Sequence, residues 1–302
     1  MKQIIVLITL ALFTSISCNK KNPETKKMEE VVPDNLTFNS GYSEVNGLRM
    51  YYEIYQPAGK DGLHGNALVL IHGGGSTIQT SFEKAIPQFS KNRQVIAVEL
   101  QAHGRTNDRN ADLSFEQDAD DVSKLLENLN IDKADFFGFS NGGTTALQIA
   151  IRHPEIVDKI ILGSTLAKRN GVPKWFWDFM KNAQLENMPE QLKTAYKQVA
   201  SDPNGLQIMH DRDAKRMVDF KDIPDEQIKS IKAPTLIIIG DKDVITLEHA
   251  IEMHRQIANS DLAIIPGGHG EYIGEITTIK PDFKKSDLVI PMIEKFLNKK
   301  EK

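Results

Sequence analysis

The chain has 302 residues, of which 40% are hydrophobic and 26% charged, and a formal net charge of −4. This is enough apolar sequence for one large α/β domain or two small ones. The negative charge argues against nucleic acid as a partner, because no basic surface is implied. Cys18 is the only cysteine, which excludes a disulfide within one molecule.

The first residues have the pattern of a secretory signal peptide. Lys2 precedes the apolar run IIVLITLALF, and the short, mostly small and polar stretch Thr14-Ser15-Ile16-Ser17 leads directly to Cys18. The run is too short for a stable membrane span, so residues 1–17 are predicted to be a signal peptide. A lone cysteine at this point resembles a bacterial lipobox, although Ser15 stands where leucine is usual. Two interpretations stay open: a lipoprotein acylated at Cys18 and facing the periplasm or cell surface, or an exported protein without an anchor.

Residues 18–36 contain almost no core-forming side chains and alternate basic with acidic clusters. This composition is typical of a flexible tether. We therefore expect the folded domain to occupy residues 37–302.

Within that domain, apolar strands alternate with helices. SGYSEV and LRMYYEIYQ flank Asn46-Gly47, a strong hairpin signal. Helices are predicted over 115–129, where Ser114 to Gln117 has capping-box spacing, and over 144–152, 247–258 and 288–297. The predicted strands are ALVLIH, QVIAVEL, ADFFGFS, KIILGST, APTLIIIG and DLAIIPG. This alternation predicts an α/β fold: a mostly parallel sheet with helices on both faces and an antiparallel hairpin.

One interval between predicted strands, about residues 166–232, is too long for a single crossover. It is polar and favours helix, and it contains the aromatic cluster Trp175-Phe176-Trp177. We predict an inserted lid or cap. Trp175 and Trp177 are expected in its interior or at an interface, with the substrate entrance as the other interpretation.

Gly138-Phe139-Ser140-Asn141-Gly142 matches G-x-S-x-G between a predicted strand and a predicted helix. A strained turn brings neighbouring backbone too close for a Cβ, hence the glycines. On its own, this serine could also be a helix N-cap.

Three further segments follow predicted strands. His72-Gly73-Gly74-Gly75 offers bare backbone whose N–H groups can turn toward a developing oxyanion, although it could equally be a tight turn. Asp241 and Asp243 follow the strand IIIG, and His269 lies among glycines after the last strand. Separately, these acids and this histidine are ordinary loop residues.

Together, a serine, an acid and a histidine would lie along the carboxyl edge of one sheet, where open α/β sheets bind ligands. A serine needs a base to take its proton during attack, and a histidine needs a carboxylate to hold its tautomer. The order along the chain therefore indicates nucleophilic catalysis.

From about Asn39 to its end, the chain resembles the α/β-hydrolase superfamily. His72–Gly75 resembles the H-G-G-G loop of esterases and lipases, and VELQAHGRT resembles the signature between that loop and the serine turn. Glu99 stands where the family more often has aspartate. A serine nucleophile disfavours the dehalogenase and epoxide-hydrolase branches, which use aspartate.

The resemblance implies Ser140 as nucleophile, His269 as base and Asp243 as the orienting acid, with Asp241 as the other candidate for the acid. By the same mapping, the backbone N–H groups of Gly74 and Asn141 form an oxyanion hole. The implied activity is cleavage of a small-molecule carboxylic ester through an acyl-enzyme. The alternatives are an amide or peptide substrate, as for an aminopeptidase, and a non-catalytic small-molecule-binding module.

No cofactor or metal is expected. His249 and His254 lack the i, i+4 spacing of a helical metal site, and neither a P-loop nor a dinucleotide fingerprint occurs. The oligomeric state stays open.

Overall fold

The computed structural model describes residues 36–57, 65–200, 202, 204–280 and 286–299. The predicted signal peptide, the predicted lipidation site Cys18 and nearly all of the predicted tether lie outside these residues. None of the described helices is long and apolar enough to span a membrane.

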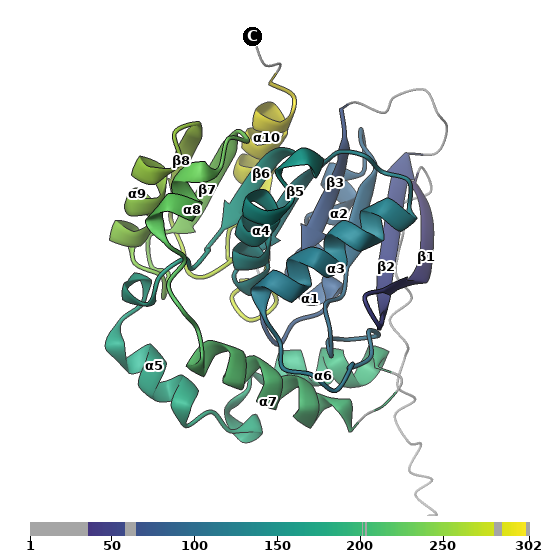
Figure 1. Ribbon diagram of the computed structural model, residues 1–302, viewed down its shortest axis with the longest axis vertical. Helices are drawn as coiled ribbons and strands as arrows, with labels where there is room; N and C mark the ends of the chain where they lie inside the picture. Colours follow the sequence, from purple (N-terminus) through teal and green to yellow (C-terminus); the bar gives the residue numbers. More distant parts are fainter. Residues whose placement is uncertain (1–35, 58–64, 201, 203, 281–285, 300–302) are drawn as a thin grey trace, which may run out of the picture. The chain divides into compact units, whose positions relative to one another are not determined.

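An eight-stranded sheet forms the centre of the fold, in the order β1-β2-β4-β3-β5-β6-β7-β8 (Figure 1). β1 and β2 pair antiparallel, β2 pairs antiparallel with β4, and all other pairs are parallel. The predicted α/β fold class is thus confirmed. The strands are β1 (Leu36–Val45), β2 (Leu48–Pro57), β3 (Ala67–Ile71), β4 (Val95–Val98), β5 (Ala134–Phe139), β6 (Val157–Gly163), β7 (Thr235–Gly240) and β8 (Ser260–Ile265).

The hairpin between β1 and β2 turns at Asn46 and Gly47, which have φ values of 46° and 78°. Positive φ at both central residues is the geometry that Asn-Gly favours and that matches the twist of the paired strands. The predicted hairpin is therefore confirmed at the predicted position.

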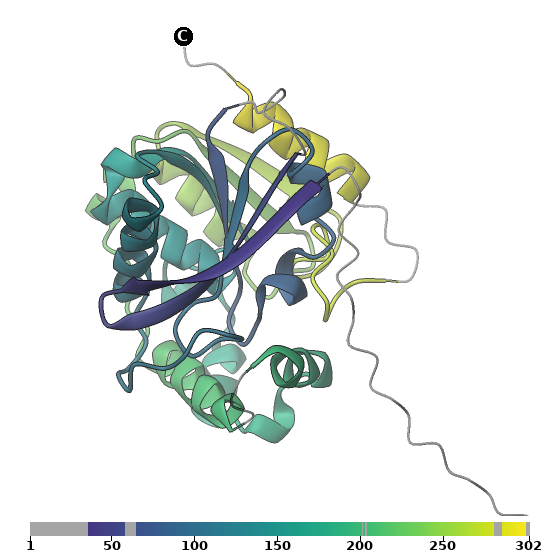
Figure 2. The same cartoon turned by 90° about the vertical axis from the view of Figure 1, so that its right-hand side faces the viewer.

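Helices cover both faces of the sheet, as Figure 2 shows. Successive residues of β3 alternate between the two cores: Val69 and Ile71 join the core under α3 and α4, whereas Leu68 and Leu70 join the core under α1, α2 and α10. Successive side chains of a strand point to opposite faces of the sheet. Because both faces are buried here, every position needs an apolar side chain, and the parallel strands are continuous apolar runs. These helices are α1 (Ile78–Phe82), α2 (Ile86–Phe89), α3 (Phe115–Asn128), α4 (Asn141–Arg152) and α10 (Ser286–Leu297), with the 3-10 turn η1 (Pro154–Ile156) after α4.

Between β6 and β7 the chain leaves the sheet. Helices α5, α6 and α7, which we call the cap, lie together below the sheet in Figure 1, whereas α8 packs beside α4 and α9. These elements are η2 (Arg169–Gly171), α5 (Lys174–Lys181), η3 (Leu185–Asn187), α6 (Glu190–Val199), α7 (Gly205–Val218), α8 (Asp225–Ser230) and, after β7, α9 (Leu247–Gln256).

The two stems of the cap are bonded to each other. The N–H of Ile223 donates to the carbonyl of Ala167 at 2.9 Å, and the N–H of Arg169 donates to the Asp222 carboxylate at 2.6 Å. The cap therefore leaves the sheet and returns to it through one narrow neck.

Candidate active site

Ser140 occupies the sharp turn between β5 and α4. Its backbone has φ 55° and ψ −121°, a conformation that is costly for a residue with a side chain. The Ser140 N–H donates to the carbonyl of Gly163 at 2.8 Å, and its own carbonyl accepts the N–H of Gly143 at 2.9 Å. These bonds hold the strained turn, so the hydroxyl stands at the carboxyl edge of the sheet.

The glycines on either side of Ser140 are required by close backbone packing. A Cβ on Gly138 would overlap the carbonyl of Gly142, and a Cβ on Gly142 would overlap the carbonyl of Ile71. Gly138 therefore lets the turn close on the start of α4, and Gly142 lets the turn fit against the end of β3.

The structure brings Ser140, His269 and Asp243 together from three strand ends. His269 Nε2 lies 3.0 Å from Ser140 Oγ, and His269 Nδ1 lies 2.7 Å from Asp243 Oδ1. A carboxylate at Nδ1 keeps the proton of the neutral ring on that nitrogen, which leaves Nε2 free to accept the serine proton. Burial lowers the pKa of His269, but the Asp243 carboxylate outweighs it, and the pKa lies above its ordinary value.

The two candidate acids have different environments. Asp243 is fully buried, and besides His269 it accepts the N–H of Ile245 at 3.0 Å. Burial raises its pKa, but the neighbouring His269 and the hydrogen bonds it accepts lower the pKa of Asp243 overall. Asp241 instead accepts the N–H of Gly267 at 2.7 Å, which ties the loop after β7 to the loop after β8.

Sequence reasoning missed two residues that support the acid. The Ser164 hydroxyl donates to Asp243 Oδ2 at 2.6 Å, and the Tyr272 hydroxyl lies 2.9 Å from Ser164 Oγ. Ser164 has φ 49°, directly after β6. The only indication of this role in the sequence is that Ser164 lies at the end of a predicted strand.

The glycine-rich loop after β3 is held by the histidine that precedes it. His72 Nε2 accepts the N–H of Leu100 at 3.0 Å, and His72 Nδ1 donates to the carbonyl of Gly73 at 2.7 Å. Burial lowers the pKa of His72 to about 3, so its ring is neutral. A Cβ on Gly74 would come within 2.5 Å of Asn141 Nδ2, so this loop lies directly against the start of α4.

Glu99 fixes the neighbouring loop after β4. Its buried carboxylate accepts the backbone N–H of Arg105 at 2.6 Å and the guanidinium of the same residue at 2.8 Å. Burial raises the pKa of Glu99 to about 7. Glutamate at this position thus holds the loop after β4 through both the backbone and the side chain of Arg105.

A cavity of about 310 Å³ connects the sheet edge with the cap. Trp175 is 60% exposed and Trp177 is buried against Phe220, and neither lines this cavity. The aromatic wall comes instead from the other face of α5. The cavity is lined by Gly74, Ser140, Asn141 and His269 at the sheet edge and by Phe176, Phe179, Met209 and Met217 from the cap, among others.

Within the described part of the chain, no group of three or more His, Cys, Asp or Glu side chains could hold a metal ion. His249 is buried, and its Nε2 accepts the N–H of Ala167 at 3.0 Å. That bond gives His249 a structural role at the base of the cap.

The chain is similar in sequence to known hydrolases. The model of the alpha/beta hydrolase fold family matches residues 66–225. The chain is 27% identical to the uncharacterized hydrolase YugF of Bacillus subtilis over 244 residues, which are 72% of this chain and 86% of that relative. It is 24% identical to the human serine hydrolase BPHL over 261 residues, with coverage of 79% and 84%.

Solved structures share the architecture. The 2-hydroxy-6-oxo-6-phenylhexa-2,4-dienoate hydrolase of a Rhodococcus species superposes with a TM-score of 0.70 at 18% identity, over 87% of this chain and 100% of that one. At this identity the likeness is one of fold.

Proposed function

The chain belongs to the alpha/beta hydrolase fold family and is a hydrolase, and from this premise we propose that it cleaves a carboxylic ester through an acyl-enzyme on Ser140. The observation that carries the proposal is the chain of hydrogen bonds from Ser140 through His269 to Asp243, at 3.0 and 2.7 Å. A serine becomes an effective nucleophile when a base oriented in this way takes its proton.

The proposed reaction has two stages. His269 Nε2 takes the proton of Ser140 as the oxygen attacks the ester carbonyl, and the backbone N–H groups of Gly74 and Asn141 stabilise the oxyanion that forms. His269 then gives its proton to the leaving alcohol, which leaves the acyl group on Ser140. A water molecule, deprotonated by His269, attacks the acyl carbonyl and regenerates the free serine with release of the acid.

An ester is the preferred substrate for two reasons. Aminopeptidases of this superfamily often carry a tryptophan next to the nucleophile, where this chain has Asn141. The cavity walls contributed by Phe176, Phe179, Met209 and Met217 suit an apolar acyl or alcohol group. A binding module on the same fold would need neither the base nor the carboxylate that orients it.

Two assays test the function directly. A fluorophosphonate probe is expected to label Ser140, and p-nitrophenyl esters of increasing chain length are expected to be hydrolysed. The absence of both labelling and ester or anilide turnover would favour the binding module. Faster turnover of p-nitroanilides than of p-nitrophenyl esters with the same acyl group would favour an amide substrate.

The pH dependence of kcat/KM is expected to follow His269. The base must be neutral to accept a proton, so activity should be lost as pH falls through the pKa of His269. Because Asp243 holds that pKa above its ordinary value, the midpoint is expected above about pH 6.5. A pH profile of kcat/KM on one neutral ester measures this midpoint. An acid limb centred below pH 6 would contradict the assignment of the base.

We also propose that the protein is exported and anchored to a membrane through acyl chains on Cys18. Cys18→Ser is expected to move the protein from the membrane to the soluble fraction, or to leave the precursor unprocessed. One acyl chain binds a membrane only marginally, so several chains on this cysteine would be needed. Ser17→Ala, which keeps a small residue next to the cysteine, should stay in the membrane fraction. Soluble wild-type protein without lipid mass on its N-terminus would exclude the anchor.

A further inference from the structure

A carboxylate from the cap reaches the glycine-rich loop beside Ser140. Asp213 lies on α7, and its side chain is only 13% exposed. Its Oδ2 accepts the N–H of Gly75 at 2.6 Å and lies 2.9 Å from His103 Nε2, and its Oδ1 accepts a hydrogen bond from Arg216. Three donors of different kinds thus converge on one buried carboxylate.

The geometry of His103 favours a charged ring. Nε2 faces Asp213, and Nδ1 lies 2.8 Å from the carbonyl oxygen of Gln101. Each ring nitrogen thus has an oxygen acceptor within 2.9 Å, closer than the Gly75 N–H, which lies 3.3 Å from Nε2; a ring with protons on both nitrogens satisfies both acceptors. Burial lowers the pKa of His103, but Asp213 outweighs it and the pKa lies above the ordinary value.

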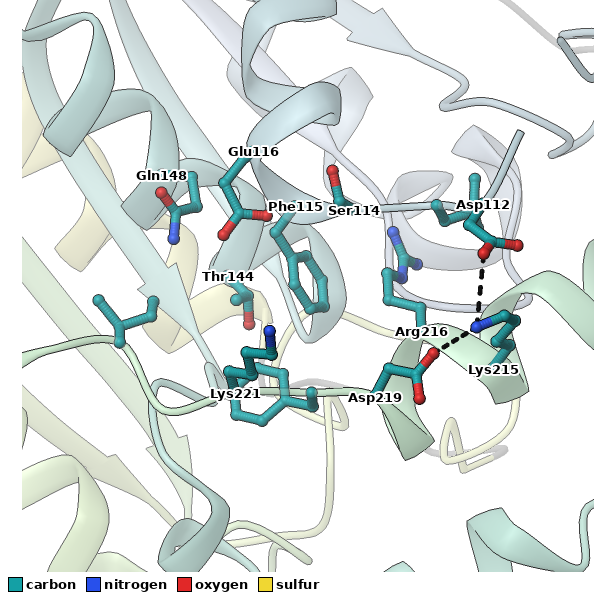
Figure 3. Close-up of a pocket in the computed structure, with 13 residues that line it drawn as sticks. Asp112, Ser114, Phe115, Glu116, Thr144, Gln148, Lys215, Arg216, Asp219 and Lys221 are labelled. Atoms are coloured by element: carbon teal, nitrogen blue, oxygen red, sulfur yellow. Dashed lines mark hydrogen bonds and ion pairs between the residues drawn. The ribbon is translucent and has the colours of Figure 1, made fainter.

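Arg216 is fixed from its other side. Its second amino group donates to Asp118 at 2.7 Å, and its guanidinium lies 4.6 Å from the centre of the Phe115 ring. Arg216 also lines a second cavity of about 280 Å³, shown in Figure 3, which contains neither Ser140 nor His269. The guanidinium is thus held in place independently of Asp213.

Gly75 N–H, His103 and Arg216 together form an anion-binding site that the chain fills with its own side chain. Asp213 lines the same cavity as Ser140 and His269. A Cβ on Gly74 would lie 3.3 Å from Asp213 Oδ2, so the carboxylate borders the residue proposed as an oxyanion donor. An anionic substrate group at this wall would find the donors that could pair with it already used by Asp213.

We propose that Asp213 is a specificity-determining residue that occupies this anion site and restricts the cavity to uncharged ester substrates. The proposal rests on the ester hydrolysis proposed above. It predicts discrimination by charge at one wall of the cavity, in addition to the apolar lining of the other walls.

Matched ester pairs test the discrimination. p-Nitrophenyl butyrate and mono-p-nitrophenyl succinate have acyl chains of equal length and differ in one carboxylate. 4-(Butyryloxy)benzoate and phenyl butyrate place the same difference in the leaving group. For at least one pair, the wild type should prefer the neutral ester by about 100-fold in kcat/KM, because an anionic group loses its hydration at this wall and finds no free donor there.

Two substitutions of Asp213 separate the effect of its charge from the effect of its volume. Asp213→Asn removes the charge and keeps the volume, so the preference in that pair should fall by about 10-fold. Asp213→Ala also empties the site, so the preference should fall by about 100-fold. The same preference in the wild type and in Asp213→Asn would overturn the proposal even if Asp213→Ala did not fold.

Formate provides a readout that does not depend on catalysis. Asp213→Ala lacks one carboxylate, and formate is the missing fragment. Saturating sodium formate is expected to raise the Tm of this variant by about 2 °C relative to sodium chloride of equal ionic strength, with no such rise in the wild type.

The charge preference and the effect of formate on Tm together distinguish a failure of the proposed function from a failure of the role proposed for Asp213. A formate-dependent rise in Tm in a protein that hydrolyses no ester would overturn the proposed function and leave the anion site standing. Ester hydrolysis with unchanged charge preference in all three proteins, and no effect of formate, would overturn the role of Asp213 alone.

Discussion

Ser140→Ala is expected to remove ester hydrolysis almost completely, with a loss on the order of 10⁶ in kcat. The substitution deletes the only atom that can form the acyl bond in the proposed mechanism. The turn should survive, because its backbone bonds to Gly163 and Gly143 do not involve the hydroxyl. The measurement is kcat on one activated ester, after thermal unfolding has shown that the variant is folded.

A second serine provides the control for this experiment. Ser230→Ala lies on α8, where the hydroxyl bonds only the carbonyl of Gln227 and is exposed, so its kcat should equal that of the wild type. If Ser140→Ala kept even a tenth of the wild-type activity, Ser140 would not be the nucleophile.

Asp243→Asn is expected to lower kcat by about 10⁴, which corresponds to roughly 5 kcal/mol of transition-state stabilisation. Oδ1 of Asp243 accepts both His269 Nδ1–H and the N–H of Ile245. An amide that turns its NH₂ toward these donors holds the wrong imidazole tautomer. An amide that keeps its oxygen there still lacks the charge that stabilises the imidazolium. Either orientation weakens the transition state.

Asp241→Asn is the matched control, two residues away in the same loop. Its carboxylate accepts one N–H, from Gly267, and an amide oxygen can accept the same bond. A change of less than about threefold in kcat is therefore expected, within the small range usual for substitutions away from a critical contact. Loss of activity in Asp241→Asn, with a normal Asp243→Asn, would exchange the two assignments.

The parts of the structure that sequence patterns predicted are those fixed by local periodicity. Apolar runs of five to seven residues predicted the inner strands, because buried parallel strands need no polar face. Asn46-Gly47 predicted the hairpin, since few dipeptides adopt positive φ at both positions. The meeting of Ser140, an acid and His269 followed from topology, because the carboxyl ends of neighbouring parallel strands share one edge. The choice of Asp243 over Asp241 came from the resemblance to the α/β-hydrolase superfamily.

The parts that were missed depend on contacts between distant segments. Asp213 and His103 are 110 residues apart, and no period within α7 indicates which of its polar residues faces the sheet. Ser164 reaches Asp243 across 79 residues of intervening chain. The sequence shows the aromatic run in α5 but not which of its rings face the cavity. That depends on how α5 is rotated against α7, and Phe176 and Phe179 are the aromatic residues of α5 that line the cavity.

The bonded neck of the cap has a consequence for how this protein can change over evolutionary time. Because Ala167 and Ile223 already hold the two stems together, the closure entropy of the intervening chain grows only slowly with its length, by about 0.6 kcal/mol per doubling. Insertions and deletions beyond the neck therefore cost little closure entropy, provided that α7 keeps the contact of Asp213 with the loop after β3. The length of the cap can therefore vary more freely than the loops that carry Ser140, Asp243 and His269.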